Sequence, residues 1–203
     1  MASSTDIYTQ LPLSFTEKAL TSSYNDPALQ SMLEEVNRMH HLLLNVQGNT
    51  PPPPVPVPPQ RSAAIEKMRT TGNAAFRKGN YKEAINMYSH GIAMAMTRPP
   101  WEPAQLLKEE LQVLYANRAQ AHMSMNNWPE ALADVSLSVD FKKAPNPKAH
   151  WRKGKALKEM GRLEEAKQAL EHGLEFGVDA DLKNLLKEVD TLLEEKRAKE
   201  SSA

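Results

Sequence analysis

The stretch "TTGNAAFRKGNYKEAINMYSHGI" (residues 70–92) has two recognisable counterparts further along the chain. They are "ANRAQAHMSMNNWPEALADVSLSV" (116–139) and "RKGKALKEMGRLEEAKQALEHGL" (152–174). A small residue, a turn residue, a large apolar residue and an alanine recur in the same order. In the three units these positions are Gly72, Ala119 and Gly154; Gly79, Asn126 and Gly161; Tyr81, Trp128 and Leu163; and Ala84, Ala131 and Ala166.

Each unit predicts two helices joined by a turn. The small residues are expected where the two helices cross closely, because a larger side chain there would push them apart. The units are offset by 47 and then 35 residues, so the first carries an insertion, near 97–107. Pro99, Pro100 and Pro103 break the helix there, and "AQLLKEELQVLYANRA" (104–119) predicts one long helix after them.

A final helix is predicted at about 180–198. One face carries a regular apolar stripe of Leu182, Leu185, Leu186, Val189, Leu192 and Leu193, and the other face is charged. The end of a helical repeat array exposes apolar surface that must be shielded from water, so we interpret this helix as a cap.

The repeated pattern resembles the tetratricopeptide repeat (TPR) family, whose usual period is 34 residues. The resemblance covers residues 65–178 and implies an all-α fold. It further implies three repeats wound into a right-handed superhelix, with a concave groove lined by the first helix of each pair. The predicted domain of repeats spans 61–178, and the cap and tail span 179–203.

The proline-rich segment "PPPPVPVPP" (51–59) separates the repeats from a small N-terminal part. Proline lacks a backbone N–H and fixes φ, so we expect an extended polyproline spacer, with a ligand for an aromatic groove as the less favoured reading. The linker is assigned to 51–60 and the N-terminal segment to 1–50. Within that segment "IYTQLPLSF" (7–15) could form a strand or an extended arm.

One amphipathic helix is predicted in the N-terminal segment, with Asp26 as its N-cap and Pro27 at its first position. Its apolar residues follow the spacing of a coiled-coil seam: Leu29, Met32, Val36, Met39, Leu43 and Val46. About fifty residues bury little core alone. The seam therefore either packs on the repeats or docks on a partner subunit, and the proline spacer favours docking.

Cationic and amide side chains occur at matching positions in the predicted first helices. They resemble the dicarboxylate clamp of chaperone-binding TPR domains, which grips the two carboxylates of a C-terminal Asp. The resemblance assigns this clamp to Arg69, Asn73, Asn117, Lys148 and Arg152, with Arg69 standing where the family has Lys. It implies an outer groove of Phe76, Gln120, Met123 and Lys155. A solvated helix face explains any one of these residues alone, whereas five at matching positions favour the clamp.

The whole-chain composition excludes several classes of function. The 203 residues carry no net charge, which argues against general affinity for nucleic acid or membrane surfaces. The absence of Cys removes disulfides and thiol chemistry. No phosphate loop, catalytic triad, metal constellation, secretory signal or membrane-spanning run is visible, so we expect neither an enzyme nor a cofactor. His40 and His41, like the His residues of the repeat helices, are interpreted as surface or packing residues.

The layout as a whole resembles the TPR-bearing peripheral subunits of the fungal Sec complex for post-translational translocation into the endoplasmic reticulum. That resemblance implies an adaptor on the cytosolic face of this membrane. Its groove would bind tails of the Glu-Glu-Val-Asp type from 70-kDa heat-shock chaperones, with the 90-kDa class as the alternative source. Its N-terminal segment would dock on a membrane-anchored sister subunit. A soluble cochaperone adaptor and a scaffold whose groove holds another subunit are the alternatives.

Overall fold

The computed structural model describes residues 11–16, 18–46, 50–142 and 144–201, and the chain divides into two compact units. The first unit comprises residues 1–56 with 99–102, and the second contains the repeat helices together with the last helix. Residues 7–10 of the possible strand at 7–15 lie outside the described part of the chain.

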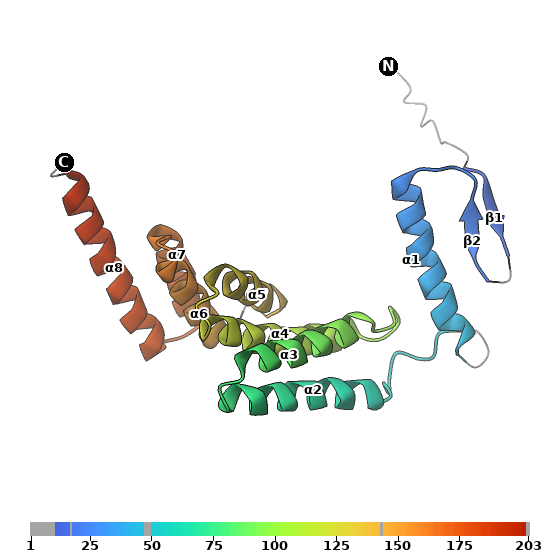
Figure 1. Cartoon of the computed structure of the whole chain (residues 1–203), viewed down its shortest axis with the longest axis horizontal. Coiled ribbons are helices and arrows are strands. Elements are labelled where there is room, and N and C mark those ends of the chain that lie inside the picture. The colour runs from blue at the N-terminus through green and yellow to red at the C-terminus, as the bar shows by residue number, and fades with distance from the viewer. Residues whose placement is uncertain (1–10, 17, 47–49, 143, 202–203) are drawn as a thin grey trace, which may run out of the picture. The chain divides into compact units, whose positions relative to one another are not determined.

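The first unit consists of a short hairpin and one helix (Figure 1). Strands β1 (Leu13–Phe15) and β2 (Leu20–Ser22) pair antiparallel, with Ser14 opposite Thr21. Helix α1 (Pro27–Leu44) begins at the cap Asp26, whose Oδ1 accepts a hydrogen bond from the Leu29 N–H at 2.9 Å. From the sequence, the segment at 7–15 could form either a strand or an extended arm, and β1 lies within it. The sequence did not predict β2.

The hairpin and α1 are joined through one side of the helix. The Asn37 amide bridges them, accepting from the Leu20 N–H at 2.7 Å and donating to the Leu20 carbonyl at 2.8 Å. Leu33, one turn earlier, is buried, and the Phe15 ring meets His40 edge-on. At 100° per residue these positions share one face of α1, and most of the apolar seam lies to one side of it.

The described residues of the second unit form seven helices, and consecutive helices pack against each other (Figure 1). Its three helical pairs and final helix are α2 (Gln60–Arg77) with α3 (Tyr81–Met96), α4 (Ala104–Met123) with α5 (Trp128–Phe141), α6 (Pro147–Glu159) with α7 (Leu163–Leu174), and α8 (Ala180–Ser201). Each pair has a turn between its two helices, and one long helix, α4, follows the insertion. The all-α repeat architecture predicted from the sequence is confirmed.

The recurring small residues lie where the two helices of a pair touch. A Cβ added to Gly72 would come within 2.6 Å of the Tyr88 ring, and one on Gly154 within 2.5 Å of Leu170. Ala119 is completely buried at the corresponding crossing. The predicted turn residues Gly79, Asn126 and Gly161 all have positive φ, a conformation that glycine and asparagine tolerate best.

Helix α8 covers the last repeat. Leu182, Leu185, Val189 and Leu193 are buried in one cluster with residues of α6 and α7, whereas Leu192 is partly exposed at 37%. The predicted stripe is thus the contact face of a cap, with Leu192 at its margin.

A buried ion pair lies beside the insertion in the first repeat. The Arg98 guanidinium donates to both carboxylate oxygens of Glu110, at 2.7 and 2.5 Å, and to Ser62 Oγ at 2.8 Å. The Arg98 side chain is only 2% exposed and that of Glu110 13%. These contacts join the end of α3 to the first turns of α2 and to the part of α4 that the insertion lengthens.

Candidate peptide-binding groove

The first helices of the three pairs, α2, α4 and α6, carry the candidate groove. Two asparagines from different repeats meet there: Asn117 Nδ2 donates to Asn73 Oδ1 at 3.1 Å. The same oxygen accepts the Tyr88 hydroxyl at 2.8 Å. Because Oδ1 is occupied twice, the orientation of the Asn73 amide is fixed, and its NH₂ has no partner within the described part of the chain.

Tyr88 is a positioning residue that the sequence reasoning missed. Its ring is buried against Gly72, and burial raises the pKa of the phenol, although the cations Arg69 and Arg77 oppose this. The hydroxyl therefore stays protonated at neutral pH and can donate to Asn73. The repeat alignment could have indicated this role for Tyr88, because the aligned residues Val135 and Leu170 are equally buried but have no polar group.

Arg152 connects α6 to α4. Its Nε donates to Gln120 Oε1 at 2.9 Å, and no carboxylate of the described residues lies within ion-pair distance of it. Burial lowers the pKa of the Arg152 guanidinium, which is nevertheless charged at neutral pH. A partly buried cation held only by a neutral amide is well suited to accept an external anion.

Lys148 lies one helical turn before Arg152 and lines the same pocket, which Gln120 also lines. Lys148 is exposed and has no ion-pair partner among the described residues. The structure thus brings together two predicted clamp cations and one predicted outer residue. Four further residues line this pocket that the sequence reasoning did not assign to it: Pro147, Trp151, Asp179 and Asp181.

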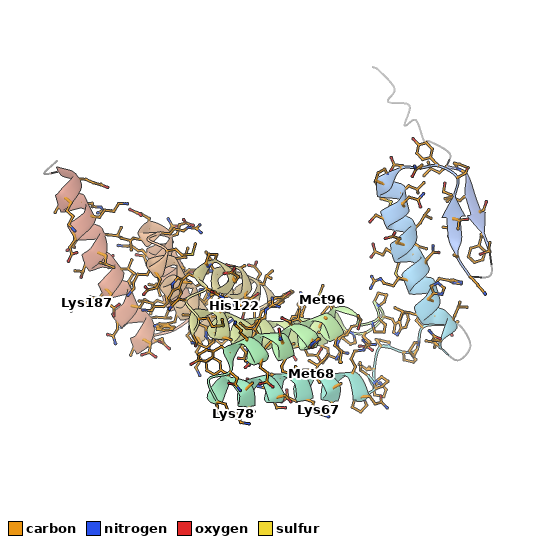
Figure 2. The ribbon with its side chains drawn as sticks, viewed as in Figure 1. Lys67, Met68, Lys78, Met96, His122 and Lys187 are labelled. Atoms are coloured by element: carbon orange, nitrogen blue, oxygen red, sulfur yellow. The ribbon has the colours of Figure 1, made fainter. Side chains whose placement is uncertain are left out.

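The fifth predicted clamp residue, Arg69, is turned toward another partner. Its Nε and Nη2 donate to the two oxygens of Glu66 at 2.7 and 2.5 Å. This hydrogen bond raises the pKa of Arg69 and lowers the pKa of Glu66. Lys67 of this helix and Lys78, its C-cap, point away from α3 (Figure 2), while Met68 lies against Gly91 of α3.

The predicted outer residues differ in how much they can offer a ligand. Met123 is only 7% exposed, and Phe76 packs on the core with its ring 5.3 Å from that of Tyr81. Lys155 forms an ion pair with Glu159 at 2.8 Å, which raises its pKa. Gln120, bonded to Arg152, is the outer residue tied most directly to the clamp.

The seam of α1 is partly exposed in the first unit. Met32 is 65% and Val36 43% exposed, while the remaining predicted docking residues, Leu29, Met39, Leu43 and Val46, are partly buried. Across the described ranges no group of His, Asp and Glu side chains is arranged to hold a metal ion. Within the same ranges no helix is both long and apolar enough to cross a membrane.

Comparisons with known proteins place these features among relatives. A tetratricopeptide repeat family model matches residues 147–176. The chain is 40% identical over 126 residues to the ER protein translocation subcomplex subunit sec67 of Schizosaccharomyces pombe. This match covers 61% of the chain and 65% of sec67, so the chain spans slightly less than two thirds of that relative. The predicted resemblance to TPR-bearing Sec subunits is thereby confirmed.

Two solved structures extend the comparison. A chain in the cryo-electron microscopy structure of the Saccharomyces cerevisiae Sec complex matches with a TM-score of 0.74, covering 92% of this chain and 99% of that one. At 24% identity this likeness shows the fold alone. The first TPR domain of Spaghetti (RPAP3), bound to the HSP90 peptide SRMEEVD, matches with a TM-score of 0.56 and 28% identity. That match covers 65% of this chain and 94% of the domain.

The repeat spacing, the glycine crossings, the left-handed turns and the family match at 147–176 agree with one another. A tetratricopeptide repeat thus occupies residues 147–176, and two further helical pairs with the same kinds of crossing and turn residues precede it.

Proposed function

We propose that the chain is a non-catalytic adaptor that binds the acidic C-terminal tail of cytosolic heat-shock chaperones. The tail would end in Glu-Glu-Val-Asp and would lie in the groove of the repeats, at 61–178. Through its segment 1–50, tethered by the linker 51–60, the adaptor would attach to a membrane-anchored subunit of the Sec complex. It would thereby act at the cytosolic face of the endoplasmic reticulum, recruiting chaperones for post-translational import.

The observation that carries the tail-binding proposal is the pairing of free cations with oriented amides. Lys148 and Arg152 share a pocket, and among the described residues neither has a carboxylate within ion-pair distance, although Asp179 and Asp181 also line this pocket. Asn73 and Asn117 meet on the neighbouring helices, and the Asn73 NH₂ has no partner among the same residues. A terminal Asp presents two carboxylates close together, and cations with amide donors can bind both without crowding further positive charges.

The relatives support both halves of the proposal. Sec67 is described as a subunit of an ER protein translocation subcomplex. The RPAP3 domain was solved with an HSP90 peptide that ends in EEVD. The sequence similarity to sec67 and the structural similarity to the RPAP3 domain support an adaptor whose groove receives chaperone tails and whose N-terminal part determines where it acts.

Titration with tail peptides tests the groove. We expect a peptide ending in Glu-Glu-Val-Asp to bind the full-length chain with micromolar affinity, about −8 kcal/mol. Amidating its C-terminus should nearly abolish binding, and added salt should weaken it, because the contacts are ionic and partly exposed. Isothermal titration with peptides from the 70-kDa and 90-kDa classes, each free and amidated, also identifies the preferred tail. Equal binding of free and amidated peptides would contradict the clamp.

The α1 seam is the proposed docking surface for the sister subunit. The hairpin covers the side of α1 that carries Leu33 and Asn37, and leaves Met32 and Val36 exposed beside it. Apolar side chains at seam spacing on an exposed helix face favour packing against a partner helix.

We predict that Val36→Asp abolishes association with the membrane-anchored subunit and leaves tail binding unchanged. A carboxylate in the centre of an apolar interface has to be desolvated without a partner, which opposes association. Affinity purification of the tagged full-length chain from detergent-solubilised membranes measures association, and peptide titration measures the groove.

Ser31→Asp is the matched control, because it adds the same charge to α1 away from both the seam and the hairpin. It should leave association intact. Loss of tail binding together with association in Val36→Asp would show that the N-terminal part is integral to the repeats. If the wild-type chain binds tails but recovers no membrane-anchored subunit, the soluble cochaperone alternative replaces the Sec adaptor. If the wild-type chain binds no tail peptide, the alternative of a scaffold whose groove holds another subunit replaces the Sec adaptor.

A further inference from the structure

At the predicted clamp position 69, this chain has arginine where the family has lysine. The guanidinium of Arg69 already binds a carboxylate of the same chain, that of Glu66. Nε and Nη2 of Arg69 form one edge of the planar guanidinium, and both donate to Glu66, three residues earlier on α2. The pair is on the surface, with the side chain of Arg69 32% and that of Glu66 53% exposed. An exposed pair of this kind is weak enough to exchange with an external carboxylate.

The guanidinium of Arg69 points toward Glu66 and away from the Asn73 amide, with which it would have to bind the ligand. Glu66 lies on the N-terminal side of Arg69, whereas Asn73 lies about one helical turn, roughly 5.4 Å, on the C-terminal side. With the fork on Glu66, Arg69 lines a groove between α2 and α4 that is also lined by Glu109 and Val113. Arg69 and Asn73 would both face one ligand carboxylate only after the fork leaves Glu66.

Glu66 can compete with a ligand carboxylate because residue 69 is arginine instead of lysine. A lysine ammonium has three donors around a point charge and can contact two carboxylates at once. An arginine has five donors in a rigid planar fork; one carboxylate fills the Nε–Nη2 edge and leaves only the end formed by Nη1 and Nη2 for another. A ligand that approaches Arg69 therefore meets an edge that is occupied and a negative charge, Glu66, beside it.

We propose that Glu66 is an internal competitor for the groove: its carboxylate occupies the edge of Arg69 that a ligand's terminal carboxylate would bind, and so limits the affinity for acidic tails. The inference rests on the proposed tail binding. It makes Glu66 an affinity-determining residue, because an arginine paired with it would bind an acidic tail more weakly while keeping its charge.

Replacing the competitor tests the proposal. Glu66→Gln should tighten binding of the peptide ending in Glu-Glu-Val-Asp about two- to fivefold, the range expected for an exposed ion pair. The matched control is Glu109→Gln, which removes a charge from the wall of the same groove. Glu109 accepts a hydrogen bond from Gln105 instead of from Arg69, so its replacement should change affinity less. Fluorescence anisotropy with a labelled peptide on the full-length chain resolves both effects.

A double-mutant cycle separates competition from simple repulsion. If Glu66 acts by occupying Arg69, the tightening caused by Glu66→Gln should shrink when Arg69 is replaced by Ala. An undiminished tightening in the Arg69→Ala background means that Glu66 only repels the ligand, and it overturns the proposal. Weaker binding by Glu66→Gln overturns it too, since Glu66 would then be holding Arg69 in its binding position.

The failure of this inference is distinguishable from that of the proposed function. If the wild-type chain binds the free peptide and Glu66→Gln binds it no more tightly, only the inference is overturned. If neither protein binds the free peptide better than the amidated one, both are overturned. Binding that appears only in Glu66→Gln supports the inference most strongly, because the internal carboxylate then closes the site.

Discussion

Replacing Arg152 with alanine is expected to weaken binding of the free tail peptide at least about tenfold. This guanidinium is partly buried, and within the described part of the chain its one hydrogen-bond partner is the Gln120 amide. A ligand carboxylate would supply the missing counter-charge, and a charge-assisted hydrogen bond contributes roughly 1.5–3 kcal/mol, or about ten- to 150-fold. Isothermal titration measures the loss. Asn117→Ala, which removes an amide donor, should act in the same direction.

The same substitution should leave the fold intact. Burial lowers the pKa of Arg152, so the folded state disfavours its charge, and removing the charge relieves that cost. Gln120 loses a donor but is partly exposed and can bond to water. Circular dichroism at 222 nm should therefore show unchanged helicity. A collapse of helicity along with binding would assign Arg152 to the fold.

Lys153→Ala is the matched control for Arg152→Ala. It removes one positive charge from the adjacent position of α6, but Lys153 lines a different surface, together with Glu165 and Gln168 of α7. We expect tail affinity to stay within about twofold of wild type. Equal weakening by the two variants would mean that the peptide responds to net charge and that Arg152 does not contact it. Arg152→Lys should fall between them, because it keeps the charge and loses the fork.

The repeat architecture could be predicted because its determinants are local. A left-handed turn requires Gly79, Asn126 or Gly161 at a fixed offset, and a close helix crossing requires Gly72 or Gly154. The turn and crossing residues of one unit lie within about forty residues of each other, and the same pattern occurs in all three units. Aligning the chain with itself therefore reveals them. The hairpin had no such repetition. Strand β2 contains three residues and is held by the amide of Asn37, seventeen residues away from Leu20.

The side-chain arrangement of the groove could be predicted only in part. The helix period places Asn73, Asn117 and Arg152 on the first helices, and the structure gives them contacts between repeats. Rotamers depend on every neighbour, however, including residues that repeat alignment treats as core. Tyr88 fixes the Asn73 amide from a core position, and Glu66 captures Arg69. The clamp itself remains a prediction until a ligand is measured.

Replacing Arg98 with alanine is expected to lower the free energy of unfolding of the repeat unit by about 3–5 kcal/mol, the cost of leaving one member of a buried ion pair alone. Arg98 holds both oxygens of Glu110 and the hydroxyl of Ser62. Its loss leaves a carboxylate that is 13% exposed without its cation. Because these contacts join α2, the end of α3 and α4, the first repeat and its insertion should loosen first. Urea unfolding followed at 222 nm should show a lower midpoint.

The expected loss of stability comes from the burial of the Arg98–Glu110 pair, and its bidentate geometry alone would not cause it. A second bidentate pair in the same chain serves as a control. Arg162 also holds both oxygens of a glutamate, Glu165, at 2.7 and 2.5 Å, but this pair is on the surface. Solvent screens that pair, so Arg162→Ala should not shift the midpoint measurably. Replacing Arg98 with Met and Glu110 with Leu together should recover most of the lost stability, since no charge then remains to be desolvated. A midpoint for the double variant as low as that of Arg98→Ala would instead assign the loss to packing around the insertion.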